Sequence, residues 1–233
     1  MATDLIELAL TDLSESFARY RLRTPAAARA LAVSLRRFGQ LSPVVVFRWQ
    51  DRYEVVDGFK RLAAARTVGE MPRLWARVLE TDERSAKAAI YTLNRVSGKP
   101  SELEEAWIVH ALVREDGLPQ VEVAELLGRH KSWVCRRLAL IEKLAEPAQE
   151  ELKVGLLSPT CARQLVRLPP GNQVWKRLGV LIEWLTRMEG WLTHAGRASV
   201  TPQDGVVLGP RFTRLAVVAS AVAALARDFD AAS

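Results

Sequence analysis

The chain has 233 residues, enough for one large domain or two small ones, and 49% of these residues are hydrophobic while 26% are charged. This composition excludes an intrinsically disordered chain. The formal net charge of +6 favours a polyanionic partner such as nucleic acid, although an arginine-rich soluble protein has the same balance.

The cysteines and the N-terminal segment indicate the cellular compartment. Cys135 and Cys161 lack CxxC spacing, and with three scattered histidines they predict no metal site and a reducing compartment. Asp4 and Glu7 interrupt the apolar run of residues 1–10, which is therefore not a signal peptide, and no segment reaches the roughly 18 apolar residues of a membrane span. We expect a cytoplasmic protein without a membrane partner.

The first hundred residues alternate strand and helix signals. "LIELAL" at 5–10 predicts a strand, and residues 24–39 predict a helix. That helix has Thr24 as its cap, Pro25 in its first turn, Leu31, Leu35 and Phe38 at helical spacing, and Gly39 at its end. "PVVVF" and "YEVV" predict a hairpin joined by "RWQDR", residues 58–68 a further helix, and "RLWARVL" another strand. An α+β N-terminal domain follows.

Strand signals nearly vanish after Glu83. Residues 85–93 predict a helix, "SGKP" breaks it, and the capping box S-E-L-E at Ser101 opens a helix through Val113. We therefore expect an N-terminal domain of residues 1–98 and an all-α domain of residues 99–170.

The remainder of the chain is predicted to be helical. Short helices are expected within 142–155 and 157–168, and a tryptophan-rich amphipathic helix at 174–192. A turn-rich linker at 197–210 precedes a helix at 211–229, whose broad apolar face serves either burial on its own domain or self-association. Residues 171–233 thus form a third region of C-terminal helices with a possible role in oligomerisation.

The stretch "EVVDGFKRLAAAR" at 54–66 has the pattern of an anion site. A strand turns at Asp57 and Gly58 into a helix, with Lys60 and Arg61 directly after the turn. Backbone N–H groups at a helix start lack intrahelical partners and attract anions, and glycine permits close approach. The alternative is a solvated first turn capped by Asp57.

A second motif, "LPQVEVAELLGRHKSWVCRRLALIEKL" at 118–144, has the pattern of a helix-turn-helix. Apolar residues define the inner faces of its two helices, and Gly128 permits the turn between them. The inner-face residues are Val123, Ala124 and Leu127 in the first helix and Val134, Leu138 and Ile141 in the second. An ordinary helical hairpin with a basic face is the alternative.

The second helix is predicted to direct polar and cationic side chains outward, toward phosphates and base edges in the major groove. Gln120, at the start of the first helix, is positioned to hold a phosphate. The outward residues are Lys131, Ser132, Trp133, Arg136 and Arg137. Trp133 fits a packing role equally well.

Together these motifs resemble the ParB family of partition proteins over residues 3–170. "SLRRFGQLSP" resembles the family's first nucleotide-binding box, "DGFKRLAAA" its arginine box, and "LNRVSGKPSELEEA" its third box. The resemblance implies a ParB/sulfiredoxin-like N-terminal fold, binding of CTP and magnesium, and an arginine near DNA at Arg163. The nucleotide-binding residues that it implies are Ser34, Gly39, Pro43, Gly58, Lys60, Arg61 and Asn94.

The chain departs from the family pattern at several positions. Phe59 and Lys60 replace the usual Glu-Arg pair, Leu93 stands where a glutamate linked to hydrolysis is usual, and Ser97 replaces an arginine. The resemblance therefore implies nucleotide binding but leaves weak CTP hydrolysis open, and we assign no catalytic residue. It also implies a homodimer and a partition ATPase partner, although residues 171–233 do not match the family's dimerisation domain.

Three functions follow. The first is a sequence-specific double-stranded-DNA-binding protein of plasmid or chromosome partition, gated by CTP as a clamp on the nucleoid or plasmid. The second is a transcriptional regulator or mobile-element accessory protein that lacks the nucleotide switch. The third is an enzyme on the same fold, but a sulfiredoxin-like one needs a cysteine near Phe59, and a nuclease needs more carboxylates than Glu54 and Asp57.

Overall fold

The computed structural model describes residues 5–22, 25–69, 71–98, 101–169 and 172–173. The chain divides into two compact units, residues 1–138 and 139–233. The described part of the second unit ends at Gln173.

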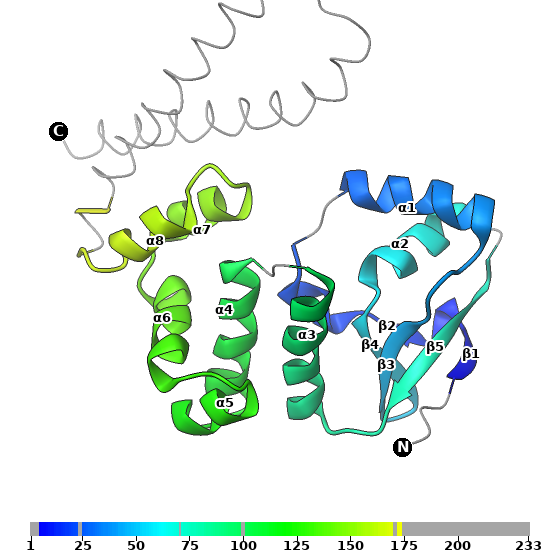
Figure 1. Ribbon diagram of the computed structural model, residues 1–233, viewed down its shortest axis with the longest axis horizontal. Helices are drawn as coiled ribbons and strands as arrows, with labels where there is room; N and C mark the ends of the chain where they lie inside the picture. The colour runs from blue at the N-terminus through cyan, green and yellow to red at the C-terminus, as the bar shows by residue number, and fades with distance from the viewer. Residues whose placement is uncertain (1–4, 23–24, 70, 99–100, 170–171, 174–233) are drawn as a thin grey trace, which may run out of the picture. The chain divides into compact units, whose positions relative to one another are not determined.

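A five-stranded mixed sheet forms the base of the first unit (Figure 1). Its order is β1-β5-β3-β4-β2, with β1 antiparallel to β5, β3 parallel to β5 and antiparallel to β4, and β2 parallel to β4. The strands are β1 (Leu5–Ala9), β2 (Leu13–Ser14), β3 (Val44–Trp49), β4 (Arg52–Asp57) and β5 (Arg73–Leu79). The 3₁₀ turns η1 (Leu10–Asp12) and η2 (Ser16–Tyr20) flank β2.

One face of the sheet is covered by α1 (Pro25–Phe38) and α2 (Phe59–Val68), seen together in Figure 1. The core on this face is aliphatic and includes Leu35, Val46 and Leu62, of which the last two are fully buried. Gly39 ends α1 in the left-handed region at φ +67°, as predicted from its position. Phe38, expected on the apolar face of this helix, is instead 57% exposed, because α1 ends there before the chain turns into β3.

The other face is covered by α3 (Glu83–Ser97), which lies between the sheet and α4 (Glu102–His110) (Figure 1). A second core begins with aromatic and aliphatic residues of this face, passes through α3 and α4, and reaches Val123 and Leu138 in the next two helices. The predicted capping box is present, because the Ser101 side chain accepts from a backbone N–H of the first turn and the Glu104 side chain accepts from the Ser101 N–H. The first unit is therefore continuous from the sheet to the helix-turn-helix.

A π-helical segment, η3 (Ala111–Glu115), continues α4 and is followed by Asp116, which takes part in an ion-pair network around a buried lysine. The Lys87 ammonium, almost fully buried on α3, donates to both carboxylate oxygens of Asp116 at 2.7 and 2.9 Å and pairs with Glu83 at 3.1 Å. Burial alone would lower the pKa of Lys87, but its bonds to Asp116 and Glu83 outweigh this, and the pKa is raised. The network fastens α3 to the end of the π-helical segment.

The helix-turn-helix consists of α5 (Gln120–Leu126) and α6 (Lys131–Glu142), with Gly128 at φ +61° in the turn between them. The second unit contains α7 (Glu146–Lys153) and α8 (Pro159–Leu165), and Ser158 caps α8 by accepting from Cys161 N.

The predicted fold class, α+β followed by helices, is confirmed. So are the strands, the hairpin, and the helices predicted up to residue 168. Thr24 and the elements predicted at 174–192, 197–210 and 211–229 lie outside the described residues. The division at residues 98 and 170 stays a prediction.

Candidate functional site

The chain leaves β4 and enters α2 through an irregular, tightly packed junction. The pairing of β3 and β4 shifts register between Val45 and Val46, and such a bulge redirects the strand just before Asp57. Gly58 follows at φ +100°, and a Cβ on it would lie 2.7 Å from the Val44 Cγ1 atom. Only glycine fits this position, because both the backbone conformation and the space exclude a side chain.

Gly58 is the N-cap of α2, and no side chain within the described part of the chain caps this helix. Asp57 does not take that role, because its Oδ2 atom pairs with Arg61 Nη2 at 2.9 Å. The alternative of a first turn capped by Asp57 is therefore wrong. The first N–H groups of α2 are left for an external acceptor, next to the positive end of the helix dipole.

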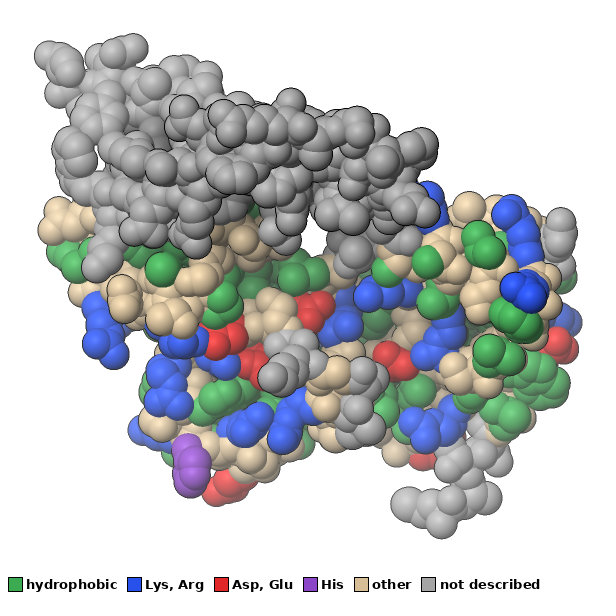
Figure 2. Space-filling view, turned by 45° about the horizontal axis from the view of Figure 1, so that its top comes forward, with side chains coloured by type: hydrophobic (Ala, Val, Ile, Leu, Met, Phe, Trp, Pro, Cys, Tyr) green, Lys and Arg blue, Asp and Glu red, His purple; other side chains and the backbone are tan. Residues whose placement is uncertain are grey.

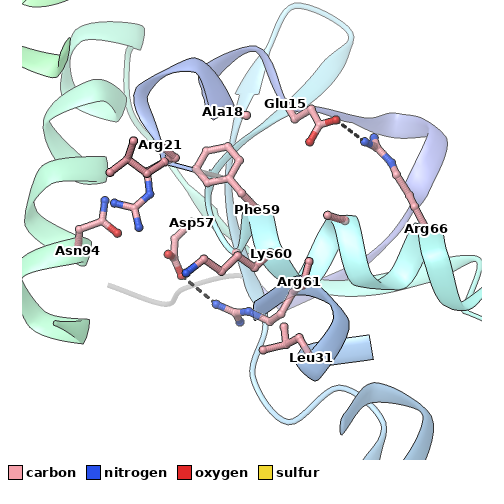
Figure 3. Close-up of a pocket in the computed structure, with 14 residues that line it drawn as sticks. Glu15, Ala18, Arg21, Leu31, Asp57, Phe59, Lys60, Arg61, Arg66 and Asn94 are labelled. Carbon is pink, nitrogen blue, oxygen red and sulfur yellow. Dashed lines mark hydrogen bonds and ion pairs between the residues drawn. The ribbon is translucent and has the colours of Figure 1, made fainter. Parts of the chain in front are cut away.

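A pocket of about 570 Å³ opens at this helix start (Figure 3). Its walls come from η2 and the residues on either side of it, from α1, from the end of β4, from α2, and from α3. The lining residues are Glu15, Ala18, Arg21, Leu22, Ala28, Leu31, Asp57, Gly58, Phe59, Lys60, Arg61, Ala63, Arg66 and Asn94. Four of these are cations and two are carboxylates, so the pocket has a net positive lining.

Most pocket cations have internal acceptors. Arg61 Nη1 donates to the Ser42 carbonyl at 2.8 Å and also bonds the Pro43 carbonyl, which ties the start of β3 to α2. Arg66 pairs with Glu15 at 2.7 Å. Lys60, in contrast, is exposed to solvent at the pocket.

The predicted nucleotide-binding residues divide into two groups. Gly58, Lys60, Arg61 and Asn94 are brought together in the pocket lining, although the first three lie at the start of α2 and Asn94 lies on α3. Ser34, Gly39 and Pro43 do not line it, and Pro43 reaches it only through its carbonyl bond to Arg61.

Sequence reasoning missed Arg21, Arg66, Glu15 and the ring of Phe59 as pocket residues. Arg66 lies on the same predicted helix as Arg61, but residues five apart do not share a helix face, so the spacing alone did not indicate it. Arg21 and Glu15 carried no local signal, because they follow β2, whose pairing with β4 is a long-range contact.

The helix-turn-helix has the inner faces that the sequence predicts. Val123, Ala124, Leu127, Val134 and Leu138 are all buried in one core. Ile141 is only half-buried, whereas Leu140 is fully buried.

The exposed face of α6 is basic. Lys131, Ser132 and Arg136 are all exposed, and Figure 2 shows Lys and Arg side chains at several places on the described surface, among hydrophobic and polar ones. Gln120, at the start of α5, is half-buried, and its Oε1 accepts from Cys135 Sγ on α6 at 3.0 Å. Arg163 lies on α8 in the second unit and bonds Thr160.

Arg137 does not point outward, so this prediction is wrong. Its side chain is buried, with Nε 2.6 Å from Glu105 Oε2 and Nη1 3.2 Å from Glu102 Oε2. The physical reason is that Arg137 lies next to buried Leu138, at the edge of the apolar face of α6, where the carboxylates of Glu102 and Glu105 on α4 face it. Arg137 therefore fastens α6 to α4.

Trp133 has the packing role that was its alternative. Its ring is half-buried 5.5 Å from the Tyr91 ring, and the guanidinium groups of Arg129 and Arg137 lie 5.4 and 5.2 Å from its centre. A tilted ring pair with cations close to the rings stabilises the start of α6 against α3.

Among the described residues, no group of three or more His, Cys, Asp or Glu side chains is arranged to hold a metal ion. None of the described helices has the length and apolar character needed to cross a membrane.

The fold and site define a class: an α+β domain with an anion-attracting pocket at a helix start, joined to a helix-turn-helix. Residues 2–94 match the ParB N-terminal domain, and residues 100–183 match the ParB HTH domain. Both signature domains are present in order over most of the chain, which belongs to the ParB family.

Relatives include chromosome-partitioning and nucleoid occlusion proteins. The chromosome-partitioning protein Spo0J of Thermus thermophilus is 36% identical over 149 residues, covering 63% of this chain and 54% of that protein. The nucleoid occlusion protein of Bacillus mycoides is 30% identical over 171 residues, covering 71% of this chain and 58% of that protein. The chain spans about half the length of the curated relatives it matches.

Two solved structures of the C-terminally truncated ParB from Caulobacter crescentus are also similar. The complex with CTP-gamma-S has a TM-score of 0.38 and 22% identity, covering 76% of this chain and 99% of that chain. The complex with the centromeric parS site has a TM-score of 0.48 and 21% identity, covering 74% of this chain and 90% of that chain.

Proposed function

We propose that this protein is a sequence-specific DNA-binding protein of plasmid or chromosome partition, and that its pocket binds CTP. The observation that carries the proposal is the uncapped start of α2, which opens into a cationic pocket in the same compact unit as α5 and the N-terminal part of α6. Membership in the ParB family supports the partition role.

The pocket residues fit a nucleoside triphosphate. The free N–H groups at the start of α2 would donate hydrogen bonds to phosphate oxygens, and the Gly58 backbone, without a side chain, permits their approach. Lys60, on the solvent-exposed side of the pocket, would neutralise part of the phosphate charge. Asn94 would face the phosphates and an accompanying magnesium ion. The triphosphate of a bound nucleotide would place negative charge next to the cations that line the pocket.

Hydrolysis is proposed to be slow or absent. Leu93, half-buried on α3 against the second core, has no group to orient water where the family usually has a glutamate. Steady-state phosphate release by the wild type and by Leu93→Glu tests this: the variant should turn over faster. Wild-type turnover equal to that of family members with the glutamate would contradict it.

DNA would be contacted by the exposed face of α6 and the start of α5. Arg136 is the candidate for base edges, Lys131 and Ser132 for phosphates, and Gln120 for a phosphate at the first helix. Arg163 would be a further contact from the second unit. A homodimer and a partition ATPase remain proposals from the family resemblance.

Calorimetric titration with each nucleoside triphosphate, with and without magnesium, tests the pocket. We expect CTP to bind, and Lys60→Ala to weaken binding by about 1.5–3 kcal/mol because a charge-assisted contact is lost. Arg29→Ala is the matched control, since Arg29 is an exposed cation on α1 outside the pocket lining. No heat of binding at millimolar CTP would overturn the nucleotide proposal and leave a DNA-binding protein without the switch.

A further inference from the structure

A second, smaller pocket of about 200 Å³ lies at the end of the hairpin formed by β3 and β4, and it shares no lining residue with the pocket at the start of α2. Its lining residues are Ser14, Trp49, Gln50, Asp51, Arg52 and Glu54. The sheet explains this grouping, because residues directly opposite each other share a face, as do residues two apart on one strand. Ser14 on β2 lies opposite Glu54, and Trp49 on β3 lies opposite Arg52.

The Glu54 carboxylate in this pocket is buried without a cation. The residue is 3% exposed, and its Oε1 atom accepts from the Phe17 N–H at 3.0 Å. Within the described ranges of the chain, no ion pair and no further hydrogen bond reaches this carboxylate. A carboxylate has about four acceptor positions, and a buried one is ordinarily compensated by a cation or by several donors. Glu54 therefore lacks a donor that a positively charged ligand in the pocket would provide.

The other lining residues favour an organic cation. Trp49 is 44% exposed, and its ring lies 6.1 Å from the ring of buried Phe47, which limits its movement. Asp51, exposed in the turn of the hairpin, adds a second carboxylate, so the lining has two carboxylates and one cation on a chain whose net charge is +6. A buried carboxylate beside an indole ring suits an ammonium group better than a metal ion, which needs more oxygen ligands than gather anywhere in the described residues.

We propose that the pocket at the end of the β3–β4 hairpin binds a primary ammonium group carried on an alkyl chain. The ammonium donates to the Glu54 oxygen that Phe17 leaves free, the Trp49 ring stabilises its charge, and Asp51 adds a second attraction. Arg52 is exposed and lines the same pocket, so its like charge limits the affinity. A lysine side chain of another protein and a free polyamine both carry the required group.

Titration of the full chain with n-butylammonium, followed by the indole N–H resonance of Trp49, tests the proposal. The variant Trp49→Phe identifies that resonance, since it removes the signal. We expect a saturable shift in the wild type and none with n-butanol, which has the same chain without the charge. Glu54→Gln keeps an oxygen for the Phe17 N–H but removes the charge, and it should weaken n-butylammonium binding by at least about tenfold.

Glu80→Gln is the matched control, because it makes the same change at an exposed carboxylate outside the pocket, and it should leave the affinity unchanged. Arg52→Gln should strengthen binding, since it removes the like charge. Asp51→Asn changes only an exposed turn and should weaken binding, which keeps the test decisive if Glu54→Gln fails to fold.

The identity of the amine is tested with two further probes. Spermidine that binds more tightly than Nα-acetyl-lysine amide would assign the pocket to a polyamine, because a second ammonium reaches Asp51, whereas equal affinities would assign it to a lysine side chain. A wild type whose Trp49 resonance does not respond to n-butylammonium would overturn the proposal. Equal affinities in the wild type, Glu54→Gln and Asp51→Asn would do the same.

Discussion

Gly58 and Gly69 bracket the same helix, and both adopt left-handed backbone conformations, with φ of +100° and +74°. They differ in space, because a Cβ on Gly58 would meet Val44, while a Cβ on Gly69 would have nothing within 4 Å. Gly69→Ala should cost about 1 kcal/mol of unfolding free energy, the backbone term, and Gly58→Ala clearly more, about 2–4 kcal/mol. Urea denaturation measures both, and equal losses would show that Val44 yields to the methyl group.

Arg136 and Arg137 are neighbours in the chain with different surroundings. Arg137→Ala leaves Glu105 buried without its partner, so it should lower the unfolding free energy by about 3–5 kcal/mol. Arg136→Ala should leave stability within about 0.5 kcal/mol and cost about 1–3 kcal/mol on the specific DNA site, relaxing preference at one base pair.

Denaturation together with fluorescence anisotropy on specific and scrambled duplexes separates these two effects. Lys131→Ala serves as the comparison, expected to weaken both duplexes alike and to lower the salt slope by about 1. A stable Arg137→Ala protein with altered base preference would contradict the assignment.

At the scale of the element, α3 begins at a strong cap. Asp82 Oδ1 accepts from the Ser85 N–H at 2.7 Å, and the bonds from the Ser85 backbone and side chain hold the pKa of Asp82 below its ordinary 3.8. Because the folded pKa is lowered, the stabilisation is fully present above pH 3.8 and is lost as pH falls through the folded value.

Asp82→Ala should therefore destabilise the protein by about 1 kcal/mol at pH 7, and the difference should narrow only below pH 3.8. Glu80→Ala, an exposed carboxylate in the preceding segment, should change little at either pH. Urea denaturation at several pH values checks both. A difference that already narrows between pH 7 and pH 5 would point to another titrating group.

Local signals were sufficient to predict most elements. The capping box at Ser101, the left-handed Gly39 and the β-branched runs of the hairpin each act within a few residues of the backbone they determine. The pocket was predicted around Gly58 and at Asn94, whereas Arg21 was missed because it reaches the pocket through the long-range pairing of β2 with β4. The orientation of Arg137 was wrong because helical periodicity places a residue on the edge of a face but does not reveal the two carboxylates opposite.

At the scale of the whole first unit, nucleotide binding should increase the free energy of unfolding. A ligand that binds only the folded state at 100 times its dissociation constant adds about 2.7 kcal/mol to the unfolding free energy. CTP at that concentration should raise the unfolding free energy of the wild type by this amount and shift its urea midpoint upward accordingly. The midpoint of Lys60→Ala should rise less at the same CTP concentration. A midpoint unmoved by CTP in the wild type would argue against a folded-state nucleotide site.

The core that runs from the sheet through α3 and α4 to α5 and α6 also limits how this architecture can be recombined. A recognition helix grafted from a relative would have to pack its own apolar face into the core that includes Val109 and Leu112. If it carried an arginine at the position of Arg137, that arginine would need the carboxylates of Glu102 and Glu105 as partners. New DNA preferences are therefore most accessible through exchanges on the exposed side of α6, at positions such as Ser132 and Arg136. Exchange of the entire helix-turn-helix should give a stable protein only when α3 and α4 are exchanged together with it.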